Sequence, residues 1–218
     1  MASWMAHLRI ADQLLDGLGA LPRAHFVVGN IAPDSGEPNA DWSAFSPPTE
    51  LSHWTLPGAP RDSGAERFRE KHLAAAMPPD AFAFCLGYYA HLLTDYIWRR
   101  DVYLPQAARY AEEFARDADF IWEIKRDWYD LDHLYYRKHP DFRAFAIFAG
   151  VGAFPNIYLD YFSETAFEKR IAYIADFYRG FDGDLDRVYP YFTKAEMDAF
   201  VDRAVAEIRP RLEMLCFT

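Results

Sequence analysis

The chain has 218 residues, of which 51% are hydrophobic and 17% aromatic, so it has enough apolar material for one buried core and does not have the composition of a disordered protein. Its 23 lysines and arginines stand against 33 aspartates and glutamates, which gives a formal net charge of −10. An acidic surface repels polyanions, so duplex nucleic acid and strongly anionic membranes are excluded as first-choice partners.

The N-terminal half alternates between helical and irregular patterns. Apolar residues at helical spacing predict a first helix over residues 4–18. Residues 26–60 predict a long loop instead, because a short apolar run leads into a stretch rich in proline and serine, and such a loop in a compact domain is often functional. Helical patterns return at residues 65–77 and, after two prolines, at residues 81–101.

The C-terminal half continues with helices. A long apolar stripe predicts a helix over residues 105–135 with a break near Asp119, and another helical segment follows at residues 139–150. Two capping boxes, each a threonine followed three residues later by a glutamate, predict helices that begin after Thr165 and Thr193.

These elements predict one all-α fold. With no internal repeat and no convincing β-hairpin, residues 1–218 are expected to form a single domain, a helical bundle of six or seven helices with one long functional loop at about residues 26–60. The two cysteines, Cys85 and Cys216, form no C-x-x-C motif, and the N-terminus has no basic segment followed by an apolar stretch. No run reaches the roughly 18 apolar residues of a membrane span. We therefore expect a cytoplasmic protein without a transmembrane segment.

The most informative segment is residues 82–98 of the helix expected over residues 81–101, which is apolar nearly all round and is therefore expected to be buried. His91 and Asp95 are its polar exceptions, and because they lie four residues apart they share one face. A buried carboxylate is usually paired, neutralised or bound to a metal, and an imidazole with a carboxylate suits zinc. An ordinary His–Asp hydrogen bond in the core is the alternative, and the spacing alone does not decide between them.

Three further residues carry the same chemistry. His7 falls on the apolar face of the first helix, where a satisfied core histidine is the alternative to a metal ligand. Asp34 follows Pro33, which favours an extended residue before it and suits a carboxylate held out from an irregular loop; a turn or helix cap is the alternative. His53 lies in the same loop, where the alternative is a solvent-exposed histidine.

Another cluster lies on the helix expected over residues 105–135. Asp127, Asp130 and His133 follow one another at intervals of three, so one edge of the helix presents two carboxylates and an imidazole together. The alternative is a solvated acidic face that pairs with Arg126 and Arg137.

Four motifs in this order resemble the bacterial zinc-dependent phospholipase C family over roughly residues 1–135: His7-Leu-Arg-Ile-Ala, Phe26-Val-Val-Gly-Asn-Ile-Ala-Pro-Asp34, a loop histidine at His53, and Gly87-Tyr-Tyr-Ala-His91-Leu-Leu-Thr-Asp95. The resemblance implies an all-α fold in which a cluster of zinc ions hydrolyses a phosphodiester. It implies one zinc with four ligands, namely Asp34, His53, His91 and Asp95. It also implies His7 on a second zinc that Asp95 bridges to the first.

The resemblance leaves the metal content open between one and three ions, with another divalent metal as an alternative to zinc. The family's ligands for the remaining ion have no clear match, and Asp127, Asp130 and His133 are the candidates to replace them.

We therefore expect an enzyme, a metal-dependent phosphoric ester hydrolase that resembles phospholipase C. In this hypothesis a water activated by the metal attacks phosphorus, and Asp34 is the catalytic residue that orients or deprotonates the water. Tyr88, Trp54 and Trp98 are candidates for an aromatic pocket wall, with the core as the alternative.

Two other functions remain as alternatives. The first is a hydrolase of the same fold that acts on a soluble phosphate ester, and the second is a non-catalytic helical protein with a structural metal site. The partner is expected to be a small-molecule or lipid phosphoester, which the sequence does not identify, and the oligomeric state is not determined either.

Overall fold

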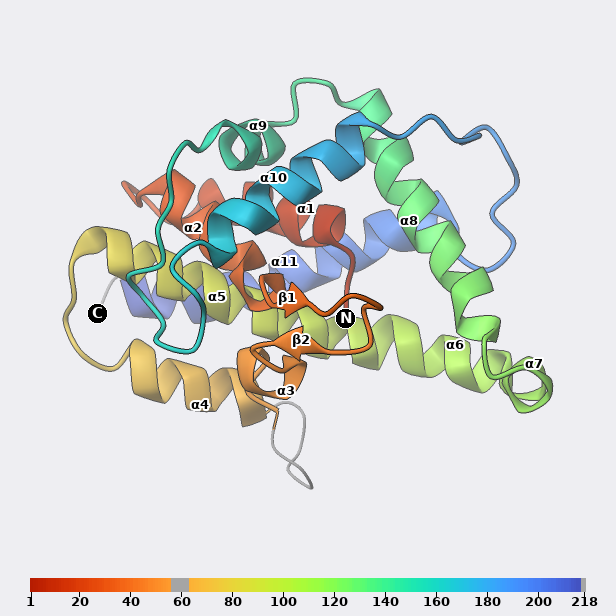
Figure 1. The fold of residues 1–218 in the computed structure, drawn as a ribbon, viewed down its shortest axis with the longest axis horizontal. Coiled ribbons are helices and arrows are strands. Elements are labelled where there is room, and N and C mark those ends of the chain that lie inside the picture. Colours follow the sequence, from red (N-terminus) through yellow and green to blue (C-terminus); the bar gives the residue numbers. More distant parts are fainter. Residues whose placement is uncertain (56–62, 217–218) are drawn as a thin grey trace.

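The computed structural model describes residues 1–55 and 63–216 and shows the predicted all-α fold (Figure 1). The N-terminal half holds α1 (Trp4–Leu15), α2 (Arg23–Ile31), a 3-10 turn (Ala32–Asp34), the strands β1 (Glu37–Pro38) and β2 (Phe45–Ser46), α3 (Thr49–Ser52), α4 (Ser63–His72) and α5 (Pro79–Trp98). The C-terminal half holds a π-helical segment (Arg99–Tyr103), α6 (Leu104–Arg109), α7 (Ala111–Arg116), α8 (Phe120–Lys138), α9 (Arg143–Gly150), α10 (Ala166–Arg179) and α11 (Lys194–Cys216).

The prediction of six or seven helices was too low, because the described residues form eleven α-helical segments. Several of the additional segments, such as α3, α6 and α7, are only one or two turns long. A segment of four to six residues is too short to show a 3.6-residue apolar period, so its helical state depends on tertiary packing. The break expected near Asp119 is present, since α7 ends at Arg116 and Asp119 precedes α8.

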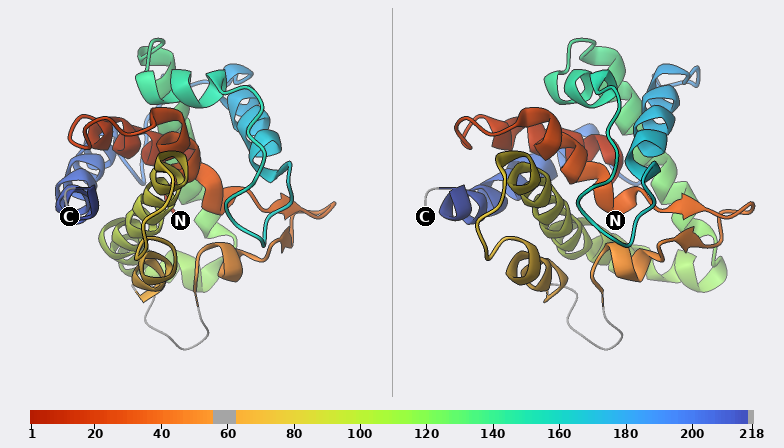
Figure 2. Two further views of the ribbon diagram at one scale, coloured as in Figure 1. Left: turned by 90° about the vertical axis from the view of Figure 1, so that its left-hand side faces the viewer. Right: turned by 60° about the vertical axis from the view of Figure 1, so that its left-hand side comes forward.

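The loop predicted for residues 26–60 begins later than expected. Its first residues belong to α2, where Phe26 and Val27 are fully buried. Residues 37–46 then form a small antiparallel pair of strands that the sequence did not predict, with Glu37 opposite Ser46. Figure 2 shows this pair projecting from the helical body. Residues 56–60 of the predicted loop lie outside the described residues.

Helices α2 and α5 touch through their main chains. A Cβ atom added to Gly29 would overlap the carbonyl oxygen of Phe84, and one added to Gly87 would overlap that of Phe26. The side chain of Asn30 fastens the same crossing, because its Nδ2 donates to the carbonyl oxygen of Gly87 at 3.3 Å. Glycine at both positions therefore permits a close approach that any other residue would prevent.

The expected burial of α5 is confirmed. Its residues from Ala83 to Thr94 are all buried, and the apolar side chains among them belong to a hydrophobic core that also contains residues of α1, α2, α8, α10 and α11. Trp98 packs edge-on against Trp128, with ring centroids 5.0 Å apart, and Tyr88 stacks on Phe68 at 4.4 Å. Tyr88 and Trp98 are thus core residues. No helix in the described ranges is long and apolar enough to span a bilayer.

Only one of the two expected capping boxes forms. At α11 the backbone N–H of Thr193 donates to the carboxylate of Glu196. In return, the backbone N–H of Glu196 donates to the hydroxyl oxygen of Thr193 at 3.3 Å. At α10 the helix begins as expected, but Glu168 accepts instead from the backbone N–H of Phe154, 2.8 Å away. A long-range donor therefore displaces the local cap.

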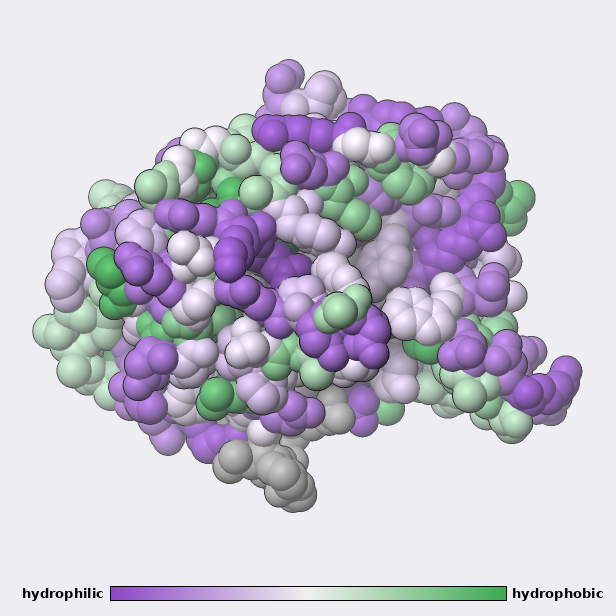
Figure 3. All heavy atoms as spheres, viewed as in Figure 1, coloured by the Kyte–Doolittle hydropathy of each residue, from purple (hydrophilic) through white to green (hydrophobic). Residues whose placement is uncertain are grey.

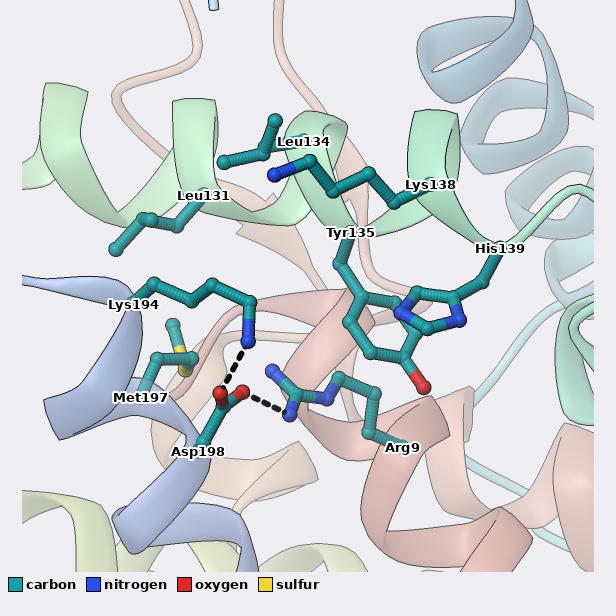
Figure 4. A pocket seen from close by; sticks show the side chains of 9 residues that line it. All are labelled: Arg9, Leu131, Leu134, Tyr135, Lys138, His139, Lys194, Met197 and Asp198. Carbon is teal, nitrogen blue, oxygen red and sulfur yellow. Dashed lines mark hydrogen bonds and ion pairs between the residues drawn. The ribbon is translucent and has the colours of Figure 1, made fainter.

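A small pocket lies where α1, α8 and α11 meet (Figure 4). Asp198 accepts from Arg9 at 2.6 Å and from Lys194 at 2.5 Å, while the Arg9 guanidinium lies 4.1 Å from the ring centroid of Tyr135. The pocket has a volume of about 10 Å³, which is room for roughly one water molecule. These ion pairs therefore hold three helices together without forming a ligand site.

Candidate metal centre

Five side chains from four separate segments converge at one buried point. α1 supplies His7, the turn after α2 supplies Asp34, the residue after α3 is His53, and α5 supplies His91 and Asp95. Their potential ligand atoms form two overlapping groups, one of His7, His91 and Asp95 and one of Asp34, His53 and His91, with all atoms of a group within 4.8 Å of one another. The structure thus brings together the residues expected for the main zinc cluster.

The spacing within this cluster fits a small tetrahedral ion. Nε2 of His53 lies 3.3 Å from Oδ1 of Asp34, 3.5 Å from Oδ2 of Asp95 and 3.4 Å from Nε2 of His91. Nε2 of His91 lies 3.6 Å from the same Asp95 oxygen. Ligands about 2.0–2.2 Å from a tetrahedral zinc ion are separated from one another by roughly 3.3–3.6 Å. The side chains are therefore spaced as zinc ligands are.

The backbone fixes the tautomers of two histidines. Nδ1 of His91 lies 2.8 Å from the carbonyl oxygen of Asn30, and Nδ1 of His53 lies 3.1 Å from that of Thr49. Because a carbonyl oxygen only accepts, each Nδ1 carries the proton and each Nε2 is left with a lone pair. Such second contacts are typical of histidines that bind metal.

The centre of the cluster therefore contains acceptors that face one another. Two imidazole lone pairs and two carboxylates converge, and unpaired acceptors in an interior are costly. A positive charge is needed among them. Either a bound divalent ion or protonation of the imidazoles would supply this positive charge.

Asp95 has one oxygen on each side of the centre. Its Oδ2 faces His53 and His91, while its Oδ1 accepts the backbone N–H of Ala2 at 2.7 Å and lies 3.4 Å from Nε2 of His7. His7 is fully buried, its ring stacks on His91 at 3.8 Å, and neither of its nitrogens has a partner in hydrogen-bond geometry. This donor set is suited to a second ion bridged by Asp95.

The electrostatics keep the carboxylates charged. Burial raises the pKa of Asp34, but the adjacent imidazole of His53 and the positive charge that His91 and His53 carry when protonated outweigh it and lower the pKa to about 2. Burial also raises the pKa of Asp95, yet the positive amino terminus and the nearby imidazoles of His7 and His91 bring it well below the usual range.

The two stacked histidines differ. Burial, and then the nearby His91, lower the pKa of His7 to about 4. Burial lowers the pKa of His91 as well, but the nearby carboxylates of Asp95 and Asp34 more than offset this, so that its pKa is raised. Ionised carboxylates and a neutral His7 are the forms that bind a metal.

Two cavities flank the cluster. One, of about 480 Å³, is lined by Asp34 and His53, and the other, of about 370 Å³, is lined by His53 and Asp95. In Figure 1 the N-terminus and the β1–β2 pair, which border the larger cavity, lie below α10 and to the left of α8. Figure 3 shows the same face with a recess bordered by pale residues of intermediate hydropathy. The cluster is thus open to ligands from two sides.

The remaining candidates are placed elsewhere. Asp127 and Asp130 both pair with Arg187, at 2.8 and 2.6 Å, and Asp127 also accepts the backbone N–H of Tyr191 at 2.7 Å. His133 stacks on Phe181 at 3.8 Å, and burial lowers its pKa to about 4. These residues bind the segment before α11 to α8 and do not join the groups of metal-ligating atoms found among the described residues.

The alternative of a solvated acidic face was also wrong. Asp127 is only 1% exposed, and its partner is Arg187 rather than Arg126 or Arg137. Arg137 pairs with Asp186 instead, at 2.6 Å. Partners about 60 residues away in the sequence carry no local signal.

Sequence reasoning missed two residues beside the cluster. Nε1 of Trp4 donates to Oδ2 of Asp34 at 3.0 Å and so holds that carboxylate in place. Arg170 on α10 lines the larger cavity, and its Nη2 donates to the carbonyl oxygen of Gly36 at 2.7 Å. Trp4 was recognised only as part of an apolar stripe, and a single arginine in a mixed helix gives no signal.

Comparison with known proteins agrees with this cluster. Residues 6–100 match the family model described as zinc dependent phospholipase C, and all five residues of the cluster lie in the matched segment. The match confirms the resemblance seen in the sequence, over a shorter stretch than expected. No curated protein and no solved structure matches the chain.

Proposed function

We propose, on the premise that residues 6–100 match the model of the zinc-dependent phospholipase C family, that the protein is a zinc-dependent hydrolase of a phosphodiester. One observation carries the proposal: four acceptor atoms of Asp34, His53, His91 and Asp95 face one another at 3.3–3.6 Å, with no donor between them. In this proposal these four residues hold one zinc, and His7 with Oδ1 of Asp95 holds a second. The whole chain acts as a single domain.

A catalytic site is favoured over a purely structural one. Structural zinc sites are closed by protein ligands, whereas catalytic sites keep a position open to water or substrate. Here cavities of about 480 and 370 Å³ meet the ligand residues from two sides. Zinc bound at this centre would polarise a phosphoryl oxygen and lower the pKa of water.

Asp34 is suited to orienting that water. One of its oxygens faces His53 and the other is fixed by Trp4, so the carboxylate has little freedom to turn. A carboxyl group with a pKa of about 2 is a weak base, so it accepts a hydrogen bond from the water more readily than it takes the proton. Asp34 is therefore proposed as a ligand and positioning group.

Activity and metal content test the proposal together. Purified protein should contain one to three zinc ions per chain and hydrolyse bis(p-nitrophenyl) phosphate, and chelation should abolish hydrolysis until zinc is restored. Because His91 is a central ligand, His91→Ala should lower kcat/KM by roughly 100-fold or more at unchanged helicity. The matched control is His139→Ala, an exposed histidine outside the cluster, which should retain activity. Full hydrolysis by metal-free protein would refute the proposal.

A further inference from the structure

The charge of the larger cavity is opposite to that of the protein. The chain has 33 acidic and 23 basic residues. The side chains that line this cavity of about 480 Å³ nevertheless include two cations, Arg170 and Lys125, and a single carboxylate, Asp34. That carboxylate belongs to the metal-ligand cluster, so a bound metal neutralises it. About half of the remaining lining residues are aromatic, including Trp4, Trp42, Trp122 and Tyr173.

Arg170 is the one buried cation in the described part of the chain, with only 7% of its surface exposed. A guanidinium has five N–H donors, and here one of them donates to the carbonyl oxygen of Gly36. No carboxylate of the described residues lies within ion-pair distance of it, and the charge of Asp34 acts on it only from further away. A buried cation without an ion pair is costly unless something else neutralises it.

Lys125 repeats this arrangement on α8. Its Nζ lies 4.4 Å from the ring centroid of Trp122, and among the described residues no carboxylate is within ion-pair distance of it. Burial lowers the pKa of Lys125. Both cations thus line the cavity, and neither has a carboxylate partner among the described residues, so each is able to bind an anion in the cavity.

An aromatic pocket beside a proposed phosphoesterase centre could instead bind a quaternary ammonium group of the substrate through the faces of its aromatic rings. In this cavity the faces of the aromatic rings already contact cationic side chains of the protein itself. The Arg170 guanidinium lies 5.7 Å from the Trp4 ring and 5.5 Å from the Tyr173 ring, and Lys125 covers Trp122. A cationic ligand would therefore compete with the protein's own cations and be repelled by them.

Trp4 connects Arg170 to the metal centre. Its Nε1 donates to Asp34, and the same indole lies against the guanidinium. One indole ring therefore separates the cation from the ligand carboxylate. A single small substrate is long enough to reach both.

Building on the proposed phosphodiesterase activity, we propose that Arg170 and Lys125 form an anion subsite of the substrate pocket. The substrate is then a phosphodiester whose unreacting substituent carries a second negative charge, and not one that carries a quaternary ammonium group. The aromatic walls suit an apolar or ring-containing part of the same substituent.

Three esters with one leaving group test this subsite in the zinc-loaded enzyme: p-nitrophenyl phosphodiesters with a carboxyethyl, a propyl or a trimethylammonioethyl arm. Wild type should prefer the carboxyethyl ester over the trimethylammonioethyl ester by roughly tenfold or more in kcat/KM, the value of one charge-assisted hydrogen bond. Arg170→Gln should remove most of this preference, and Arg170→Lys should retain part of it. Arg179→Gln, an exposed arginine on the same helix, is the matched control and should leave the preference unchanged.

Binding separates the subsite from the reaction. By calorimetry with zinc-loaded protein of equal metal content, Arg170→Gln should weaken phenylphosphonate binding by roughly tenfold, and benzyltrimethylammonium should bind more weakly than phenylphosphonate. If Arg170→Gln does not fold, Lys125→Gln on the more exposed side provides the same comparison. Equal phenylphosphonate binding by wild type and variant, or a preference for the ammonium ligand or ester, overturns the subsite. Absence of hydrolysis of all three esters refutes the proposed activity, while the calorimetry still decides the subsite.

Discussion

Two buried carboxyl groups, Asp34 and Asp132, experience opposite electrostatic environments. Burial raises the pKa of both, but Asp34 faces imidazoles, which lower its pKa to about 2. Asp132 on α8 accepts from the hydroxyl groups of Ser3 and Tyr178, at 2.8 and 2.9 Å, and from the backbone N–H of Met5. These neutral donors compensate burial only in part, and the pKa of Asp132 is raised to about 7. The start of α1 is therefore hydrogen-bonded to a carboxyl group whose pKa lies near neutrality.

This raised pKa makes stability depend on pH in a defined direction. Between about pH 4 and pH 7 the folded protein keeps the proton on Asp132, whereas the unfolded chain, with a pKa of 3.8, has lost it. The folded state binds more protons, so the contribution of Asp132 to the free energy of unfolding decreases as pH rises through this window and is constant above it. The loss amounts to a few kcal/mol at most.

Asp132→Asn, which is neutral at every pH, isolates this effect. The difference in free energy of unfolding between wild type and Asp132→Asn, measured by urea titration, should move against wild type from pH 4 to pH 7 and then level off. Asp202→Asn, an exposed position, is the control and should show no such trend. A difference that does not vary with pH would show that Asp132 titrates normally.

At the scale of elements, the crossing of α2 and α5 sets the geometry of the metal centre. The two glycines bring the main chains into contact, and this contact places the carbonyl oxygen of Asn30 where it fixes the ring of His91. Asp34 follows directly after the same helix. A shift of α2 along α5 would therefore disturb the tautomer of one ligand and the position of another.

Gly29→Ala should separate these two helices. The added methyl group overlaps the carbonyl oxygen of Phe84, so we expect a loss of roughly 1–3 kcal/mol in the free energy of unfolding, as for other overpacked cores, together with weaker zinc binding. Gly150→Ala is the matched control, because a Cβ atom there meets nothing within 4 Å. Denaturant unfolding and zinc titration measure both effects. Equal stability of the two variants would contradict the close contact.

At the scale of the whole molecule, the candidate metal centre joins segments that are distant in sequence. Its five residues span positions 7 to 95 and come from α1, the turn after α2, the end of α3 and α5. Without a cation, these segments bring carboxylates and imidazole lone pairs together; with one, they are held by coordination. Binding of a metal at this cluster would therefore be coupled to folding.

Chelation should accordingly lower the melting temperature. A ligand present at 1,000 times its Kd contributes about 4 kcal/mol, which for a chain of this size corresponds to roughly 10 °C. Differential scanning calorimetry of zinc-loaded and chelated wild type measures the shift. His91→Ala should show a much smaller shift on chelation. An unchanged melting temperature in wild type would argue against a metal linked to the fold.

The sequence predicted most where local pattern determines structure. His91 and Asp95 stood out because every neighbour on α5 is apolar, and the motifs around His7, Asp34 and His53 supported the same cluster. α2 was missed because its six consecutive buried residues, from Phe26 to Ile31, show no helical period and look the same as a strand or loop segment. Arg187 and Arg170 were missed because their roles depend on partners or cavities formed by distant segments. Local pattern thus predicts ligands and helices, and tertiary contacts determine partners and the substrate pocket.

The main-chain contact between α2 and α5 also matters for protein design. Its geometry comes from glycines and carbonyl groups, so it does not depend on which apolar side chains fill the surrounding core. Residues 29–34 and 87–95 together contain three of the five cluster residues and the carbonyl oxygen that orients one of them. A helix pair of this kind is a compact unit for transfer into a new scaffold, where a designer would need to add only two histidines to complete the centre.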